Sequence, residues 1–241
     1  MAVLAGVGVA AGAALQSATG FGFSLIAAPL AFAVLEPAEA VGLLTLLGSE
    51  VNLLTLVGER RRPQPAWRES LLIIGGAVPG AVAGVAVLRA LDPVTLQLAV
   101  SVGVVATLIA RRLAAGRTTP GWAAPIAGFA AGGLTTSTTT SGPPMLVYLL
   151  GRELTPAQLR DTMPVCFLGL SIVGALALVA TRTHGAVPDA TLVAILVPVV
   201  ALSHVAGRPL FKALERAESY ERVVTALLLV SLVVGLATAV L

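Results

Sequence analysis

The chain has 241 residues, of which 57% are hydrophobic and only 11% are charged. A soluble domain has about a quarter of its residues charged, so this composition excludes a soluble globular protein and predicts an integral membrane protein. The single cysteine, Cys166, excludes an intramolecular disulfide and a cysteine metal cluster, and the net charge of +3 suggests no nucleic-acid partner.

The first half of the chain begins with two short apolar stretches, residues 3–18 and 22–35. Three longer apolar stretches follow, at residues 38–58, 69–88 and 93–110. These runs are continuous rather than alternating, which favours helices over a β-barrel. A helix needs about 20 residues to cross the hydrocarbon core. The long stretches are therefore predicted to cross, and the short pair is predicted to form a hairpin of two half-length helices that enters and leaves on one side.

The tip of this first hairpin is predicted over the polar and glycine-rich sequence QSATGFG, residues 16–22. Non-helical backbone at membrane depth is tolerated only where protein or a water-filled cavity satisfies it. Glycine also lets a ligand approach the backbone closely. The candidate binding residues in this tip are Gln16, Ser17, Thr19, Gly20, Phe21 and Gly22.

Glu50 lies near the middle of the 38–58 stretch, with Asn52 beside it. An ionisable side chain inside a membrane is costly and indicates a functional role by default. A carboxylate that is protonated part of the time could couple the movement of an anion to a proton. The alternative is a hydrogen-bonded Glu50 that only braces a helix. Asn52 could line a cavity or bond between helices, and the same holds for Ser171.

The second half repeats the first at a spacing of about 120 residues. Gly8 corresponds to Gly128 and Ser17 to Ser137, and at a spacing of about 119 Pro37 corresponds to Pro156. The predicted helices follow the same order: short stretches at 122–134 and 143–151, and long stretches at 159–180, 189–207 and 223–241. We therefore expect two membrane repeats, residues 1–119 and 120–241, which together form one transmembrane domain.

The tip of the second hairpin is predicted over Thr135 to Ser141, where all seven residues carry a hydroxyl group, and Gly142-Pro143-Pro144 closes the run. Helices that restart after both tips would point their N-termini, with partial positive charge and N–H donors, at one cavity. This arrangement favours a small oxyanion. The alternative is that the hydroxyls bond to backbone carbonyls. The candidate binding residues here are Thr136, Ser137, Thr139, Thr140, Ser141, Gly142 and Pro143.

The distribution of basic residues predicts the topology. If each short pair returns to its own side, the loops at 59–68, 111–121, 151–160 and 208–222 share one side and hold 13 of the 15 Lys and Arg residues. The positive-inside rule then places this side in the cytoplasm and both termini outside it. Three full crossings per repeat is an odd number, so the second repeat is expected to be inverted relative to the first. The predicted fold class is thus an all-α membrane protein with two inverted repeats, each a re-entrant hairpin plus three transmembrane helices.

His204 and Arg208 are four residues apart and would be neighbours on one helix face near a membrane end. They could meet an anion that enters from the cytoplasm, although a snorkelling arginine and an interfacial histidine explain them more simply. The two histidines are far apart in sequence and no metal-binding spacing or nucleotide-binding loop is present. No metal and no cofactor are expected.

The motifs QSATGFGFSLIAAPL and PAEAVGL in the first half, and TSTTTSGPPMLVYLL and TPAQLR in the second, resemble the TauE/SafE family of membrane permeases. The resemblance covers almost the whole chain. It implies transport of sulfite, organosulfonates or related organic anions, with export from the cytoplasm across a bacterial inner membrane.

The expected function is therefore a proton-coupled secondary exporter of a small anion, and not an enzyme. The sequence leaves open a passive anion channel, an uptake permease, an intramembrane enzyme that uses Glu50 and His204, and a non-transporting membrane subunit. The expected partners are a small anionic substrate and membrane lipid. A homodimer is one assembly that the sequence allows, and no nucleic acid is expected.

Overall fold

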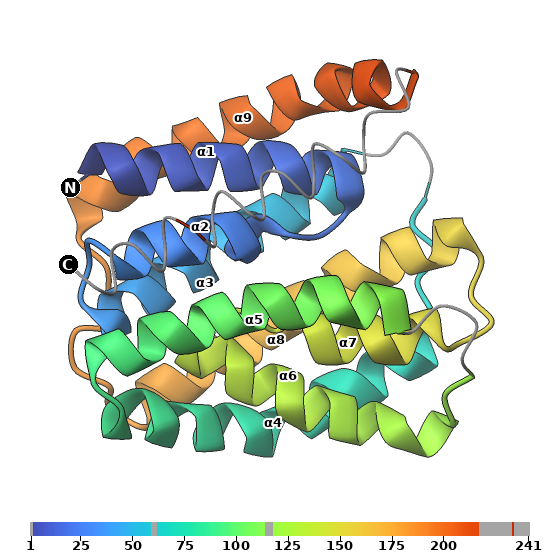
Figure 1. Cartoon of the computed structure of the whole chain (residues 1–241), viewed down its shortest axis with the longest axis horizontal. Coiled ribbons are helices and arrows are strands. Elements are labelled where there is room, and N and C mark those ends of the chain that lie inside the picture. Colours follow the sequence, from blue (N-terminus) through green and yellow to red (C-terminus); the bar gives the residue numbers. More distant parts are fainter. Residues whose placement is uncertain (1, 59–61, 114–117, 217–232, 234–241) are drawn as a thin grey trace.

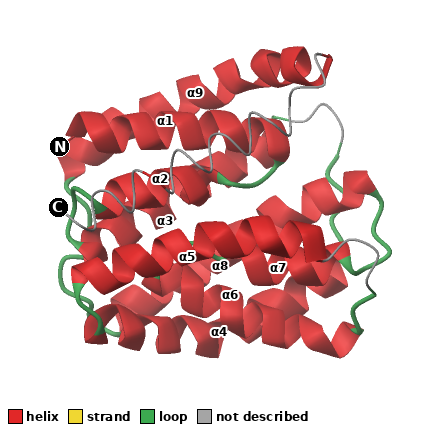
Figure 2. Cartoon of the chain, in the orientation of Figure 1, coloured by secondary structure: helices red, strands yellow, loops and turns green. Residues whose placement is uncertain are grey.

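The computed structural model describes residues 2–58, 62–113, 118–216 and 233, and these residues are helical with connecting loops (Figures 1 and 2). No strand occurs in these ranges, so the predicted all-α class is confirmed. The helices are α1 (Ala2–Thr19), α2 (Phe23–Phe32), α3 (Pro37–Val57), α4 (Trp67–Ala90), α5 (Pro93–Leu113), a 3-10 turn η1 (Gly121–Ala123), α6 (Ala124–Ser137), α7 (Gly142–Leu150), α8 (Pro156–Ala180) and α9 (Ala190–Arg216).

Within the described residues, four helices are long and apolar enough to cross a membrane. They cover Pro37–Val57, Trp67–Ala90, Ala157–Ala180 and Ala190–Gly207. These spans match four of the six predicted crossings. A fifth, residues 93–110, lies within α5. The sixth, residues 223–241, lies outside the described residues. The chain is therefore a multi-pass membrane protein.

The two short pairs form helical hairpins, as predicted. Gly8 of α1 faces Leu30 of α2, and Gly12 faces Phe23, so the two helices run antiparallel. In Figure 1, α6 and α7 likewise run away from and back toward the same end of the molecule. The helices α2 and α7 have 10 and 9 residues, too few to cross the core. With 18 residues, α1 is longer than the half-length helix expected.

Close backbone contact joins α4 to α6. A Cβ atom added to Gly76, Gly80 or Gly84 of α4 would overlap the carbonyl oxygen of Pro125, Phe129 or Gly133 of α6, respectively. The constant spacing of these pairs shows that the two helices run in the same direction. In a membrane, where lipid is as apolar as the side chains, such small residues let two backbones approach and pack.

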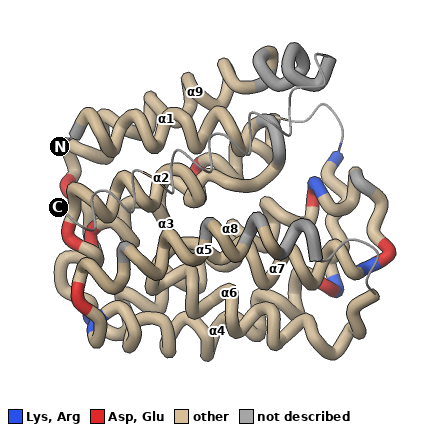
Figure 3. Tube along the Cα trace, viewed as in Figure 1, with Lys and Arg blue, Asp and Glu red and all other residues tan. Residues whose placement is uncertain are grey.

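The loops separate into two ends of the molecule. The connections α3–α4, α5–α6 and α7–α8 lie at one end, and the connections α2–α3, α4–α5 and α8–α9 lie at the other (Figure 1). The first three are the described loops predicted from charge to share a side, and we call their end the basic end. Figure 3 shows Lys and Arg at this end, whereas acidic residues predominate at the opposite end.

Candidate functional site

The two hairpin tips meet at one cavity in the middle of the helix bundle. The cavity holds about 540 Å³ of empty space, including its open side. Residues from both tips, from α3 and from α8 line it: Gln16, Phe21, Gly22, Phe23, Ser24, Leu25, Leu44, Thr45, Gly48, Asn52, Thr135, Thr139, Thr140, Ser141, Gly142, Phe167, Leu170 and Ser171. None of these lining residues carries a charge.

Two side-chain amides hold the first tip in place. The Gln16 carbonyl oxygen accepts a hydrogen bond from the backbone N–H of Phe23 at 3.1 Å, and its Nε2 donates to Asn52 Oδ1 at 2.6 Å. The Nδ2 of Asn52 donates in turn to the Gly48 carbonyl at 2.7 Å. The turn itself needs glycine, because Gly20 and Gly22 have φ values of 79° and 104°. Gln16 thus connects the start of α2 to α3.

The second tip contains a strained threonine. Thr139 has a φ of 59°, in the left-handed region that a β-branched residue rarely adopts. The hydroxyls of its neighbours, Thr138 and Thr140, lie 2.8 Å apart and bond to each other. Such strain costs about 1–3 kcal/mol and persists only where the surrounding structure imposes it. The fold therefore holds Thr139 in a defined orientation at the cavity.

Three of the seven hydroxyls of the second tip donate to backbone carbonyls, and four of the seven residues, Thr135, Thr139, Thr140 and Ser141, line the cavity. The hydroxyls of Thr135 and Ser137 donate to carbonyls one turn earlier in α6, each at 2.8 Å. Thr136 bonds to the Ala81 carbonyl of α4 at 2.8 Å. Back-bonding to the carbonyl four residues earlier is the default for Ser and Thr in a helix. These three hydroxyls therefore bond to backbone carbonyls, which was the alternative role stated for this tip.

The helix N-termini also provide fewer N–H donors than expected. In α2, the N–H of Phe23 is already bonded to Gln16. In α7, which begins at Gly142, the next two residues are Pro143 and Pro144, and proline has no N–H. The partial positive charge of the helix ends remains. Side-chain hydroxyls and amides also line the cavity beside these helix ends.

Two cavity hydroxyls are buried without a hydrogen-bond partner among the described residues. They are Thr45 Oγ1 on α3 and Thr139 Oγ1 on the second tip, and the two residues are 6% and 7% exposed. A buried hydroxyl without a partner costs about 1–3 kcal/mol. A ligand or water that accepts a hydrogen bond from each would remove this cost.

The predicted site residues divide into three groups. Those that line the cavity are Gln16, Phe21, Gly22, Asn52, Thr139, Thr140, Ser141 and Gly142. Those that lie outside its lining are Ser17, Gly20, Thr136, Ser137, Pro143, Glu50 and His204. The side chains of Thr19 and Arg208 lie outside the described part of the structure.

Three of the residues outside the lining differ in their surroundings. Ser17 donates to the Ala14 carbonyl at 2.8 Å and packs against Gly207 of α9. His204 is buried in α9, with 2% exposure. Glu50 is partly buried on α3, and its Oε2 has no hydrogen-bond partner within the described residues.

The sequence reasoning missed the contribution of α3 upstream of Asn52. Thr45 and Gly48 line the cavity together with Asn52. Their spacing of three and four residues places all three on one helix face. A polar or small residue at each of these positions, within an otherwise apolar stretch, was a signal that could have identified this face. Ser171 of α8 completes the lining on the facing helix.

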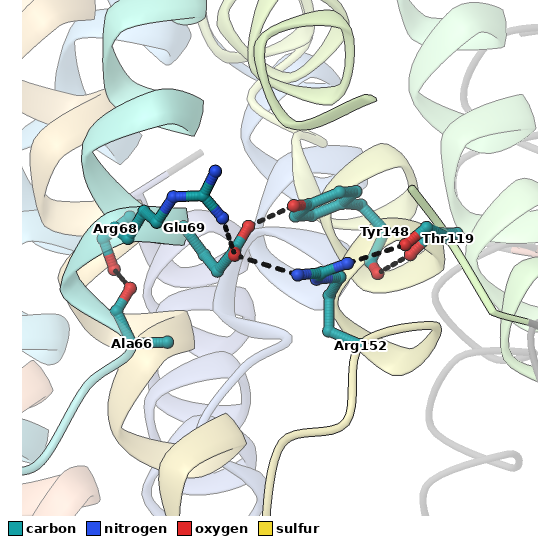
Figure 4. Close-up of polar contacts among 7 residues, drawn as sticks. Ala66, Arg68, Glu69, Thr119, Tyr148 and Arg152 are labelled. Atoms are coloured by element: carbon teal, nitrogen blue, oxygen red, sulfur yellow. Dashed lines mark hydrogen bonds and ion pairs between the residues drawn. The ribbon is translucent and has the colours of Figure 1, made fainter. Parts of the chain in front are cut away.

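A second polar cluster, at the basic end, was also missed. Glu69 in the first turn of α4 is 6% exposed. It accepts a hydrogen bond from the Tyr148 hydroxyl and lies 3.3 Å from Arg152 Nη2 (Figure 4). Arg152 also donates to the Thr119 carbonyl at 2.9 Å. These contacts fasten the end of α7 to the start of α4, so this cluster anchors the second hairpin rather than lining the cavity.

The comparison with protein families agrees with the motifs in both halves. The family described as Sulfite exporter TauE/SafE matches residues 4–236, nearly the whole chain. No curated protein and no solved structure matches. The matched region includes both hairpin tips, the cavity and all four long apolar helices. The chain belongs to the TauE/SafE family of membrane transporters.

Proposed function

We propose that this protein is a secondary permease that exports a small anion, sulfite or an organosulfonate, and that the central cavity is its substrate site. One observation carries the proposal. The two hairpin tips form a cavity that has hydroxyl and amide groups but no charged side chain among its described lining, and the buried Thr139 hydroxyl has no hydrogen-bond partner in the part of the chain that the structure describes.

Neutral donors suit a site that must release its ligand. A sulfite or sulfonate group has three oxygens that accept hydrogen bonds, and each such bond to a charged group contributes about 1.5–3 kcal/mol. The amide nitrogens of Gln16 and Asn52 each use one N–H in the bonds to Asn52 and Gly48. A second N–H on each remains to complement the Thr139 hydroxyl. A fixed lysine or arginine in the cavity would hold an anion more tightly and slow its release.

The transport mechanism we propose is the rocking of two inverted repeats, residues 1–119 and 120–241, around the cavity. Matching helix pairs support the repeats. In one pair, Gly76 of α4 packs on Pro125 of α6, and in the other Leu196 of α9 faces Gly6 of α1. A shift of about 120 residues converts one pair into the other. Figure 1 shows these pairs on opposite sides of the molecule, with α1 and α6 pointing in opposite directions.

The membrane orientation we propose places the basic end in the cytoplasm, by the positive-inside rule. The start of α1 lies at the opposite end (Figure 1), which supports an N-terminus outside the cytoplasm. The C-terminus is proposed to lie there too, although the structure does not describe it. Export then moves the anion from the basic end, across the cavity, to the opposite end.

The experiment that tests the function is uptake of radiolabelled sulfite into proteoliposomes with and without an imposed pH gradient. Loss of one hydrogen bond to the anion should lower uptake about tenfold or more. We expect this loss for Thr139→Val and Ser141→Ala, whereas Thr139→Ser should retain uptake. Ser137→Ala is the matched control, because the Ser137 hydroxyl bonds to its own helix outside the cavity.

The same assay separates the alternatives. Glu50→Gln should retain sulfite uptake but lose its response to the pH gradient if Glu50 carries the coupled proton. Uptake that does not saturate and ignores the gradient would indicate a passive channel, and a chemically altered product would indicate an enzyme. No flux above empty liposomes for sulfite, sulfonates or sulfate would contradict the proposed substrate class.

A further inference from the structure

A second groove lies beside the central cavity, between α3 and α8 and beneath the loop that joins α8 to α9. It holds about 1270 Å³, including its open side. Thr45 and Ser49 of α3 provide hydroxyl groups, and Leu46 and Leu178 contribute to apolar walls. The groove is therefore amphipathic: it is polar on part of α3 and at the α8–α9 loop, and its remaining walls are apolar.

The groove and the central cavity meet at Thr45, which lines both. Gly48 and Ser171 lie on the cavity side, and Ala175 lies on the groove side, one helical turn beyond Ser171. One turn of helix advances about 5.4 Å, so the two spaces follow one another along the α3–α8 contact. Thr45 is 6% exposed, and its Oγ1 has no hydrogen-bond partner among the described residues. It forms a polar neck between them.

Arg182 places a positive charge at the mouth of the groove, which lies at the end opposite the basic end. Arg182 and His184 line the mouth and are exposed. The loop that carries them is held in place, because Arg89 donates to Thr183 Oγ1 at 3.1 Å and Thr183 N–H donates to the Leu178 carbonyl at 3.0 Å. Arg182 is thus held where the groove opens, on the end of the protein that has few basic residues.

We propose that this groove is the half of the anion's route between the central cavity and the opposite end, with Thr45 as its neck and Arg182 as the residue that attracts the anion at its mouth. The proposal rests on the proposed function, because it takes the central cavity as the substrate site. The apolar walls of the groove also indicate the class of substrate. They favour an organic anion with a small apolar body, such as an alkylsulfonate, over a fully hydrated inorganic ion.

The test uses cysteine accessibility, which does not require transport. Cys166 is the only native cysteine, so Cys166→Ser gives a cysteine-free background. Thr45→Cys and Ala175→Cys are introduced singly and treated with water-borne methanethiosulfonates that carry either a sulfonate or a trimethylammonium group. Val82→Cys on α4 is the control, because it is 53% exposed on an apolar surface and lines neither the cavity nor this groove. Val187→Cys, which is 85% exposed, marks the mouth side.

We expect Thr45→Cys and Ala175→Cys to react from the side on which Val187→Cys reacts, and the Val82→Cys control to remain unmodified. Methanesulfonate should slow the reaction at position 45. The additional change Arg182→Gln should lower the ratio of the anionic to the cationic reaction rate about fivefold. This is the change expected when one unit charge at about 8 Å, in water, attracts one reagent and repels the other.

Two outcomes would overturn the route. Modification of Ala175→Cys no faster than Val82→Cys would mean that lipid fills the groove, and modification of Thr45→Cys from the other side alone would place the path elsewhere. If Thr45→Cys does not fold, Ser49→Cys and Ser171→Cys give the same test, because Ser49 lies on the groove side of the neck and Ser171 on the cavity side. Absence of flux for both sulfite and methanesulfonate, with normal labelling, would reject the proposed substrates and leave the route intact.

Discussion

A single side chain, Gln16, determines how the first hairpin tip meets the rest of the cavity. Its carbonyl oxygen accepts the N–H of Phe23, and its nitrogen donates to Asn52. It is 3% exposed, so both groups bond in the interior without help from bulk water. Gln16 therefore both builds the tip and contributes to the lining, and its two roles can be separated by substitution.

We predict that Gln16→Met and Gln16→Glu have different effects. Methionine leaves the Phe23 N–H and Asn52 Oδ1 buried without partners, at a cost of about 1–3 kcal/mol each, so thermal unfolding in detergent should shift to lower temperature. Glutamate keeps an acceptor for Phe23 but places a carboxyl group in the cavity. When ionised, this carboxylate should repel the anion, so added sulfite should no longer raise the unfolding temperature. Equal unfolding temperatures for Gln16→Met and the wild type would contradict this account.

At the scale of the helices, the arrangement depends on backbone contact between α4 and α6. Gly76 and Gly75 are adjacent in α4 but differ completely in surroundings. A Cβ atom on Gly76 would overlap the backbone of Pro125, whereas a Cβ atom on Gly75 would meet nothing within 4 Å. Because α6 leads directly into the second tip, its distance from α4 also sets the position of Thr139 at the cavity.

We predict that Gly76→Ala lowers the stability of the protein and that Gly75→Ala does not. Separating two packed helices to admit a methyl group costs about 1–3 kcal/mol. At Gly75, where nothing lies close by, the same change only lowers the conformational entropy of the unfolded chain. This stabilises the folded protein by about 0.5–1 kcal/mol. Thermal unfolding of the two purified variants provides the comparison. If both variants unfold at the wild-type temperature, the contact is looser than described.

For the whole molecule, composition and segment length predicted much of the fold, because these properties decide which segments cross a membrane. The breaks at both tips, the helical hairpins and the shared end of the described basic loops follow from apolar length, glycine and charge. The orientation of the hydroxyls in the second tip does not follow from these properties. Ser137 and Thr139 are two residues apart, yet one bonds to its own helix and the other lines the cavity. That difference depends on the exact end of α6 and on its packing against α4.

The cluster around Glu69 could not be predicted for a related reason. Glu69 and Tyr148 lie 79 residues apart and belong to different halves of the chain. Only the packing of α4 beside the second hairpin brings them together. Residues joined by such long-range packing have no signal in local spacing, whereas Thr45, Gly48 and Asn52 share a helix face that could be read directly.

The last prediction concerns the orientation of the molecule in the membrane. Gln64 lies in the exposed α3–α4 loop at the basic end, and Val187 lies in the α8–α9 loop at the opposite end. In the Cys166→Ser background, Val187→Cys should react with a membrane-impermeant maleimide in intact spheroplasts. Gln64→Cys should react only after permeabilisation, because the positive-inside rule places its loop in the cytoplasm. The reverse labelling pattern would place the basic end outside the cytoplasm, so export would run from the opposite end to the basic end. The cavity and the two ends of the molecule would stay as described.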